Sequence, residues 1–228
     1  VVIDGAAAAL ESAADRLPFA TTAIGRSNVS TFRTVLCASI RLLVLCLLAA
    51  GVQAVTPEIR AGGRHTIGLK ADGTIRTWGD DASGQLGVGR SLQFASPIAS
   101  GISGVRVVLV GSYHTLAQKN DGSFWAWGHN DFGQLGDGTR TDRSTPVRVS
   151  GLSGVTSLSG GGNHTVALKS DGSVWTWGYN GNGQLEDGTL TDRLTPVQVN
   201  GLTRVIAISA GFRYTVALQS DGSVWASR

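Results

Sequence analysis

The chain of 228 residues carries one sequence phrase three times and begins it a fourth time. The phrase is Gly-x-x-His-Thr, then Asp-Gly, then Trp-Gly and then Gly-Gln-Leu. Its histidines, His65, His114 and His164, stand 49 and 50 residues apart, and Tyr214 holds the fourth slot after another 50. A repeat of this length is typical of solenoids and propellers, in which each unit buries its apolar face only against its neighbours. The repeat length alone therefore limits the chain to these two fold classes.

Three other side chains recur at the same interval and complete the repeated framework. They are the tryptophans Trp78, Trp127 and Trp177, the turn aspartates Asp72, Asp121, Asp171 and Asp221, and the glutamines Gln85, Gln134 and Gln184. The repeats span about 61–110, 111–160 and 161–210, with an incomplete unit at 211–228.

The third repeat predicts four short strands. Residues 154–159 and 164–169 alternate apolar and polar residues, as half-buried strands do. Asp171-Gly172 is a hairpin turn, because Asp and Gly tolerate the positive φ that such turns require, and residues 173–177 return as a strand. After a long Gly/Asn loop, Thr195–Val199 is predicted as an outer strand, where Pro196 is tolerated. Four antiparallel strands make one propeller blade, so we predict an all-β, incomplete propeller.

The repeated motif resembles the regulator of chromosome condensation repeat. It stands in full as Gly111–Thr115, Asp121–Asn130 and Gly133–Gly136, and the resemblance covers about residues 56–228. The family implies a seven-bladed β-propeller. This chain holds about three and a half units, Glu186 replaces a motif glycine, and Tyr214 replaces a histidine. An open propeller would leave unpaired strands at its ends, so we also expect self-association.

The composition restricts the possible partners. Charged residues make up 15% of the chain, the formal net charge is +3, and no run of Lys or Arg marks a nucleic-acid site. We therefore predict no nucleic-acid partner, and the loop residues described below predict a protein partner instead. Both cysteines, Cys37 and Cys46, precede the repeats, so the repeats hold no disulfide or thiolate.

Residues 29–54 have the pattern of a signal peptide. Arg33 and Arg41 precede the apolar run 42–52, and a small-residue exit ends at Ala54, after which we predict cleavage. A retained membrane anchor and an ordinary buried helix are the alternatives. Residues 1–28 are Ala-rich and carry no repeat, and we expect them to be disordered or upstream translation. Export to the cell surface or medium follows from this interpretation.

The framework residues do not predict catalysis, a cofactor or a metal site. The three histidines fall in separate blades, so we expect each to hydrogen-bond backbone inside its own blade rather than to share a zinc ion. The aspartates belong to turns, where they bond their own backbone, and the glutamines are expected to satisfy backbone groups of the long loop. No motif places a base beside a nucleophile, so we expect no enzyme.

Function is expected on the loops of one face, where the repeats differ from one another. In a four-stranded meander, the connection between strands one and two and the loop between strands three and four emerge on the same face. The candidate partner-binding residues there are Arg64, Tyr113, Asn163, Phe212, Arg213, His129, Phe132 and Tyr179. Aromatic and Arg side chains often anchor interfaces, although neutral variation on a solvated surface would look the same.

The family that the motif resembles includes exchange factors for a small GTPase, parts of large ligases, a plant UV-B photoreceptor and secreted bacterial β-lactamase inhibitors. The photoreceptor uses Trp beside the Gly-x-x-His slot, where this chain has Gly, Ser, Gly and Phe. We therefore predict a secreted or cell-surface interaction module of bacterial type, inhibitor-like in the manner of the secreted β-lactamase inhibitors. A GTPase exchange factor and a structural array within a larger surface protein are the alternatives.

Overall fold

The computed structural model describes residues 55–89 and 93–227. The expectations for residues 1–28 and for the signal segment 29–54 lie outside these residues. Regular structure in the described part consists of strands, and no helix there has the length and hydropathy needed to cross a bilayer.

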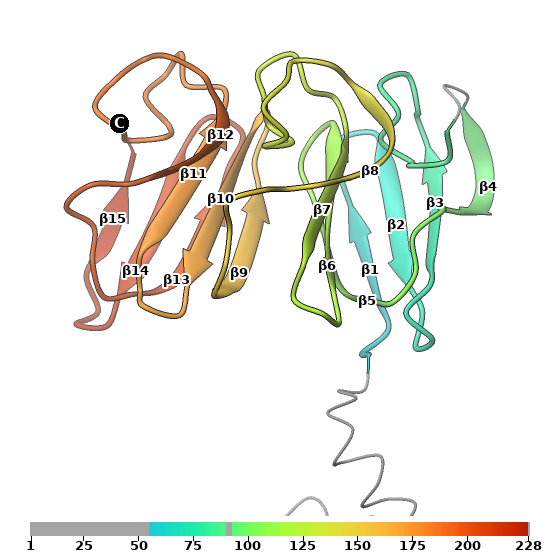
Figure 1. Ribbon diagram of the computed structural model, residues 1–228, viewed down its shortest axis with the longest axis horizontal. Helices are drawn as coiled ribbons and strands as arrows, with labels where there is room; N and C mark the ends of the chain where they lie inside the picture. Colours follow the sequence, from blue (N-terminus) through green and yellow to red (C-terminus); the bar gives the residue numbers. More distant parts are fainter. Residues whose placement is uncertain (1–54, 90–92, 228) are drawn as a thin grey trace, which may run out of the picture. The chain divides into compact units, whose positions relative to one another are not determined.

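The strands form four antiparallel sheets, each made from strands that are consecutive in the chain (Figure 1). The first sheet has β1 (Glu58–Ala61), β2 (His65–Leu69), β3 (Ile75–Gly79) and β4 (Phe94–Ala99). The second has β5 (Val105–Val110), β6 (His114–Lys119), β7 (Phe124–Gly128) and β8 (Arg143–Arg148). The third has β9 (Val155–Gly160), β10 (His164–Lys169), β11 (Val174–Gly178) and β12 (Arg193–Gln198). The fourth has β13 (Val205–Ala210), β14 (Thr215–Gln219) and β15 (Val224–Ala226).

This architecture confirms the predicted all-β, incomplete propeller of four-stranded blades. The outer strand β12 begins at Arg193, two residues before the predicted start. The sequence repeat and the blade differ in phase, because the repeat starts at the Gly-x-x-His loop whereas each sheet starts one strand earlier. A repeat therefore ends in the first strand of the following blade, which ties neighbouring blades together along the chain.

The hairpin turns follow the predicted chemistry. In the third blade, Gly172 has a φ of 78° and the backbone N–H of Ser173 donates to Asp171 Oδ1 at 2.9 Å. Asp72, Asp121 and Asp221 accept the equivalent bond, also at 2.9 Å. The turn role of the four aspartates is confirmed. Hydrogen bonds from the Ser173 side chain and backbone stabilise the ionised carboxyl, so the pKa of Asp171 lies below its usual value.

Burial of the second strand depends on whether its blade has neighbours on both sides. In the first blade, β2 alternates between buried and half-buried residues, as a strand with one covered face does. In the second and third blades, β6 and β10 are buried from their first residue to their fifth. The sequence of β10 suggested simple alternation, but its second face is covered by the adjacent blade.

The repeat tryptophan joins each blade to the preceding one. Trp127 packs against Gly87 of the first blade and Trp177 against Gly136 of the second, and both rings are fully buried. A Cβ at Gly136 would lie 2.8 Å from Trp177 Nε1, so only glycine leaves room for the ring. Trp78 has no preceding blade among the described residues and is half-buried. In the third blade Glu186 holds the glycine position with a φ of 49°, and Ser227 stands at the matching tryptophan position of the next unit.

The repeat histidine also crosses the boundary between blades, which corrects the prediction that it bonds backbone within its own blade. His65 Nε2 lies 2.9 Å from Thr115 Oγ1 of the next blade, and that hydroxyl donates to the carbonyl of Gln85 at 2.9 Å. His114 and His164 make the same bond to Thr165 and Thr215 at 3.1 Å. A prediction confined to one repeat could not find a partner that the next repeat supplies.

Because each threonine hydroxyl donates to a carbonyl, it accepts from the histidine, and the imidazole is therefore the neutral Nε2–H tautomer. The three Nδ1 atoms are buried and have no hydrogen-bond partner in the described part of the chain. Burial lowers the pKa of His65 and of His164 to about 4, and that of His114 to about 3.

Candidate functional site

The loops between first and second strands and those between third and fourth strands lie on one face, as predicted. Backbone hydrogen bonds link the first set of loops from blade to blade. Gly63 N donates to Ser112 O at 3.1 Å, and Ser112 N donates to Gly161 O at 3.0 Å. A further bond joins Gly162 N to Gly211 O at 3.2 Å. This loop face is therefore a preformed platform across four blades.

Four of the eight predicted partner-binding residues form one continuous aromatic ridge on this face. The rings of Tyr113 and His129 are 6.1 Å apart, those of His129 and Phe132 are 6.0 Å apart, and those of Phe132 and Tyr179 are 4.8 Å apart. All three contacts are edge-to-face, the arrangement that aromatic pairs prefer. The ridge runs from the second blade onto the third, so its shape depends on how these blades pack.

Gln134 orients His129 within the ridge. Its Oε1 accepts from the backbone N–H of Phe132 at 3.1 Å, which leaves its Nε2 to face His129 Nδ1 at 2.7 Å. An amide nitrogen only donates, so His129 Nδ1 is the acceptor and the ring proton sits on Nε2. Gln85 and Gln184 accept the equivalent backbone bond from Ser83 and Asn182, at 2.9 and 3.0 Å. The predicted loop role of the glutamines is confirmed, and Gln134 adds the positioning of His129 to it.

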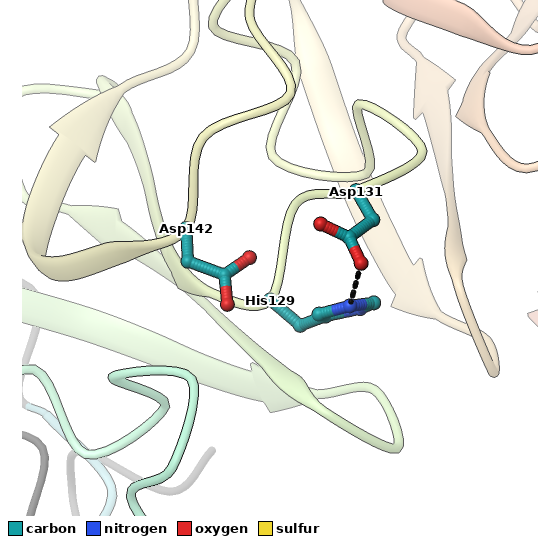
Figure 2. A group of neighbouring side chains, drawn as sticks. All are labelled: His129, Asp131 and Asp142. Carbon is teal, nitrogen blue, oxygen red and sulfur yellow. Dashed lines mark ion pairs between the residues drawn. The ribbon is translucent and has the colours of Figure 1, made fainter.

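Two carboxylates stand beside the ridge. Asp131 and Asp142 both turn their oxygens towards the ring of His129 (Figure 2), and Asp131 Oδ2 lies 3.1 Å from His129 Nε2. The side chain of Asp131 is 69% exposed and Asp142 is also exposed. The ridge therefore combines apolar ring surface with negative charge that solvent can reach.

The same three residues could be considered as metal ligands, because one ligand atom of each lies within 4.8 Å of the others. The hydrogen bonds of His129 are unfavourable for metal binding. A metal at His129 Nε2 needs that nitrogen unprotonated, which moves the proton to Nδ1, where the amide of Gln134 presents another donor. The geometry is better suited to a hydrogen-bond donor beside two acidic acceptors.

A buried asparagine holds the long loop that carries His129 and Phe132. Asn130 Oδ1 accepts from the backbone of Leu135 at 3.0 Å, and its Nδ2 donates to the carbonyls of Thr139 and Thr141 at 3.1 Å. Its backbone N–H donates to Asp142 Oδ1 at 2.7 Å. Asn180 makes the corresponding bonds in the third blade. Rigid loops present side chains at low entropic cost, which favours binding.

The other four predicted residues take different positions. Asn163 Oδ1 accepts from Gln134 Nε2 at 3.4 Å and so adjoins the ridge. Arg64 lies on the first blade, where its guanidinium is 3.9 Å from Asp80. Phe212 and Arg213 form a separate pair on the fourth blade, with the guanidinium 5.7 Å from the ring. Among the described residues, no ring contact or hydrogen bond connects these last three to the ridge.

Sequence reasoning missed Asp131, Asp142 and the role of Asn130. Asp131 follows directly after His129 and Asn130, so its place on the loop face was visible in the sequence. Asp142 lies on the far arm of the long loop, and only the folding of that loop brings it to His129.

Comparisons with known proteins agree with this fold. The family model described as the regulator of chromosome condensation (RCC1) repeat matches residues 121–168 and 171–218. A second model of the same repeat matches residues 58–85, 106–134 and 155–184. The chain belongs to the RCC1 repeat family. The matched residues contain the Asp-Gly turns and the Trp-Gly motifs of the three complete RCC1 repeats, and the Gly-Gln-Leu motifs of the second and third.

Solved structures show the same propeller. Yeast RCC1 (Prp20), in a crystal structure with Kap60, has a TM-score of 0.69 at 21% identity over 76% of this chain and 44% of that chain. Prp20p from Saccharomyces cerevisiae, in a structure reported with its binding to Gsp1p and histones, has a TM-score of 0.67 at 21% identity, over 76% and 45%. Human WBSCR16 has a TM-score of 0.66 at 23% identity, over 75% and 47%. The chain thus spans less than half of these relatives' length, and no curated protein matches it significantly.

Proposed function

We propose that this RCC1-repeat chain is a protein-binding module of a secreted or cell-surface protein and that it performs no catalysis. The observation that carries the proposal is the aromatic ridge of Tyr113, His129, Phe132 and Tyr179, set on loops that hydrogen bonds hold rigid. Aromatic side chains on a preformed platform supply large contact area with little loss of side-chain entropy, which is how protein interfaces gain affinity.

The carboxylates beside the ridge indicate the chemistry of the partner. Asp131 and Asp142 are exposed, and the Nε2–H of His129 is already directed to Asp131. An Arg or Lys side chain of a partner would pair with these carboxylates while its stem lies against the rings of Tyr113 and Phe132. We therefore expect a partner whose docking segment is basic.

The structures of the relatives support a protein partner in general terms. Prp20 is named in complex with Kap60 and in connection with Gsp1p and histones. At 21% identity this likeness bears on the fold alone. Regulation of a small GTPase is therefore the second candidate function for this chain and not the first. Export separates the two candidates, since exchange on such a GTPase takes place inside the cell. A reporter fused behind residues 29–60 is expected to appear outside the cell, and its retention in the cytosol would favour the second candidate.

Binding at the ridge is tested by photocrosslinking the full chain in its native host. A photoreactive phenylalanine analogue replaces Phe132 in one variant and Ser123, in the hairpin at the other end of the second blade, in the control. We expect a discrete adduct from position 132 alone, and its loss when Tyr113→Ala or Asp131→Asn is added. Equal adducts from the two positions, or an adduct insensitive to both substitutions, would refute the ridge as the binding surface.

A further inference from the structure

The junction between the first and second blades lacks one residue that the next two blades possess. After β8 the chain continues Val149-Ser150-Gly151, whereas after β4 it continues Ser100-Gly101. Hydrogen bonds fix the alignment, because Ser100 N donates to Ile75 O just as Val149 N donates to Phe124 O and Val199 N to Val174 O. Val149 and Val199 are buried in the hydrophobic core. Ser100 therefore puts a hydroxyl where the equivalent blades put an apolar side chain.

A groove lies between the two blades where Ser100 replaces the valine. A cavity of about 520 Å³ lies there, lined among others by Gly87, Ile102, Lys119 and Trp125. A second hollow of about 340 Å³ adjoins it and is lined by Ser100, Arg76 and Ile75, and the two share the segment that includes Ala99 and Gly101–Ser103. Volumes of 300–1,000 Å³ are the usual range for small-molecule sites. We call this place the seam groove.

Buried polar groups around the seam groove are left without partners. The indole N–H of Trp127, which lies against Gly87, has no hydrogen-bond partner among the described residues, nor has the buried hydroxyl of Ser100. At the next junction the equivalent Trp177 donates to Gln134 O at 2.9 Å, and Val149 packs near Gly136. Buried donors without partners are rare and call for an explanation such as a bound molecule.

Cationic groups line the seam groove as well. Lys119 Nζ lies 5.5 Å from the centre of the Trp125 ring, whereas in the third blade Lys169 Nζ lies 3.9 Å from Trp175. In the first pair the ammonium stands further from the ring and borders the groove. Arg76 is exposed at the second hollow and forms no ion pair with the described residues. At the second hollow Lys70 and Asp72 also line the wall, and they pair with each other at 2.8 Å. The groove thus offers one aromatic face with the ammonium of Lys119 beside it.

We propose that the seam groove binds a small organic carboxylate with an apolar body. The body lies against Trp125 and Ile102, and the carboxylate pairs with Lys119. This site shares no residue with the aromatic ridge and is independent of the protein partner proposed for the ridge.

Phenylacetate is the probe, added to the full chain labelled with ¹⁵N and followed by NMR and calorimetry. We expect saturable binding with shifts at the indole N–H signals of Trp125 and Trp127. Lys119→Gln is expected to weaken binding about tenfold, because it removes a charged hydrogen bond. Lys169→Gln, the matched change in the third blade, is expected to leave the affinity unchanged. Ser100→Val restores the apolar residue of the other blades and is expected to abolish binding without unfolding the protein.

The neutral isostere phenylacetamide separates charge recognition from apolar adhesion, and we expect it to bind at least tenfold more weakly than phenylacetate. The proposal is overturned if phenylacetate gives no saturable shifts. It is equally overturned if the two lysine variants or the two probes behave alike, or if Ser100→Val binds as the unaltered chain does.

Discussion

Acid should destabilise this protein through its three junction histidines. His65, His114 and His164 are neutral donors to a threonine of the next blade, and each buried Nδ1 has no partner in the described ranges. Protonation would place a charge and a proton at an atom that burial has separated from water. The folded pKa values, about 4, 3 and 4, therefore lie below the value of 6.5 that the unfolded chain has.

The direction of the effect follows from this difference. Below pH 6.5 the histidines bind protons in the unfolded state but not in the folded state. The free energy of unfolding is therefore highest above pH 6.5 and falls as the pH drops towards the folded pKa. Each pH unit in this window costs about 1.4 kcal/mol per histidine. At pH 5 the loss is about 2 kcal/mol for each histidine and about 6 kcal/mol for the three together.

The assay is urea unfolding of the full chain at pH 7.5 and pH 5.0. The matched variant His65→Gln/His114→Gln/His164→Gln keeps an N–H donor near each Nε2 position but cannot titrate. Its unfolding free energy should change by about 6 kcal/mol less between the two pH values than that of the unaltered chain. An equal pH dependence in both proteins would refute the neutral, buried histidine junction. The carboxyl groups with lowered pKa values do not mask the effect, since they titrate below this window.

Three further substitutions test the blade junctions by chemical denaturation. Gly136→Ala should lower the free energy of unfolding by about 3 kcal/mol, because the new Cβ would meet the ring of Trp177. The control is Gly138→Ala, which should cost about 1 kcal/mol, because Gly138 also has a positive φ but no atom closer than 3.9 Å to the new Cβ. Equal losses would contradict the close packing of Trp177 against Gly136. Glu186→Gly should stabilise the chain by about 1 kcal/mol because it relieves a φ of 49° in a residue with a Cβ, and a destabilisation would show that the Glu186 side chain matters more than its backbone. Thr115→Val should lower the free energy of unfolding by about 2 kcal/mol, because it removes the hydrogen-bond partner of His65 Nε2 and of Gln85 O. The control is Thr66→Val at the equivalent, half-buried position of the first blade, where the loss should be smaller.

The sequence predicted the parts of this fold that a single repeat determines. The Asp-Gly turns, the four strands and the loop role of the glutamines depend on neighbours within about 30 residues, and local chemistry is enough to place them. The face that carries the candidate site also followed, because the direction of each strand in a meander is set by its order.

Contacts between repeats were the part that could not be predicted from one unit. The partner of His65 is Thr115, and Trp127 fits against Gly87, so both depend on the angle at which two blades pack. The ridge likewise required the long loop to bring Phe132 against Tyr179 of the next blade. The seam groove does have a signal in the sequence, since Ser100-Gly101 is one residue shorter than Val149-Ser150-Gly151.

The central claim is that recognition takes place on the loop face while the repeated framework only holds the blades together. Hydrogen–deuterium exchange of the full chain, alone and with the protein captured by the crosslinker at position 132, tests it most directly. We expect slower exchange on binding in residues 112–114, 129–134 and 179–184, with no change in the hairpins at 119–123 and 169–173. Slower exchange confined to those hairpins would contradict it, because the partner would then occupy the opposite end of the blades.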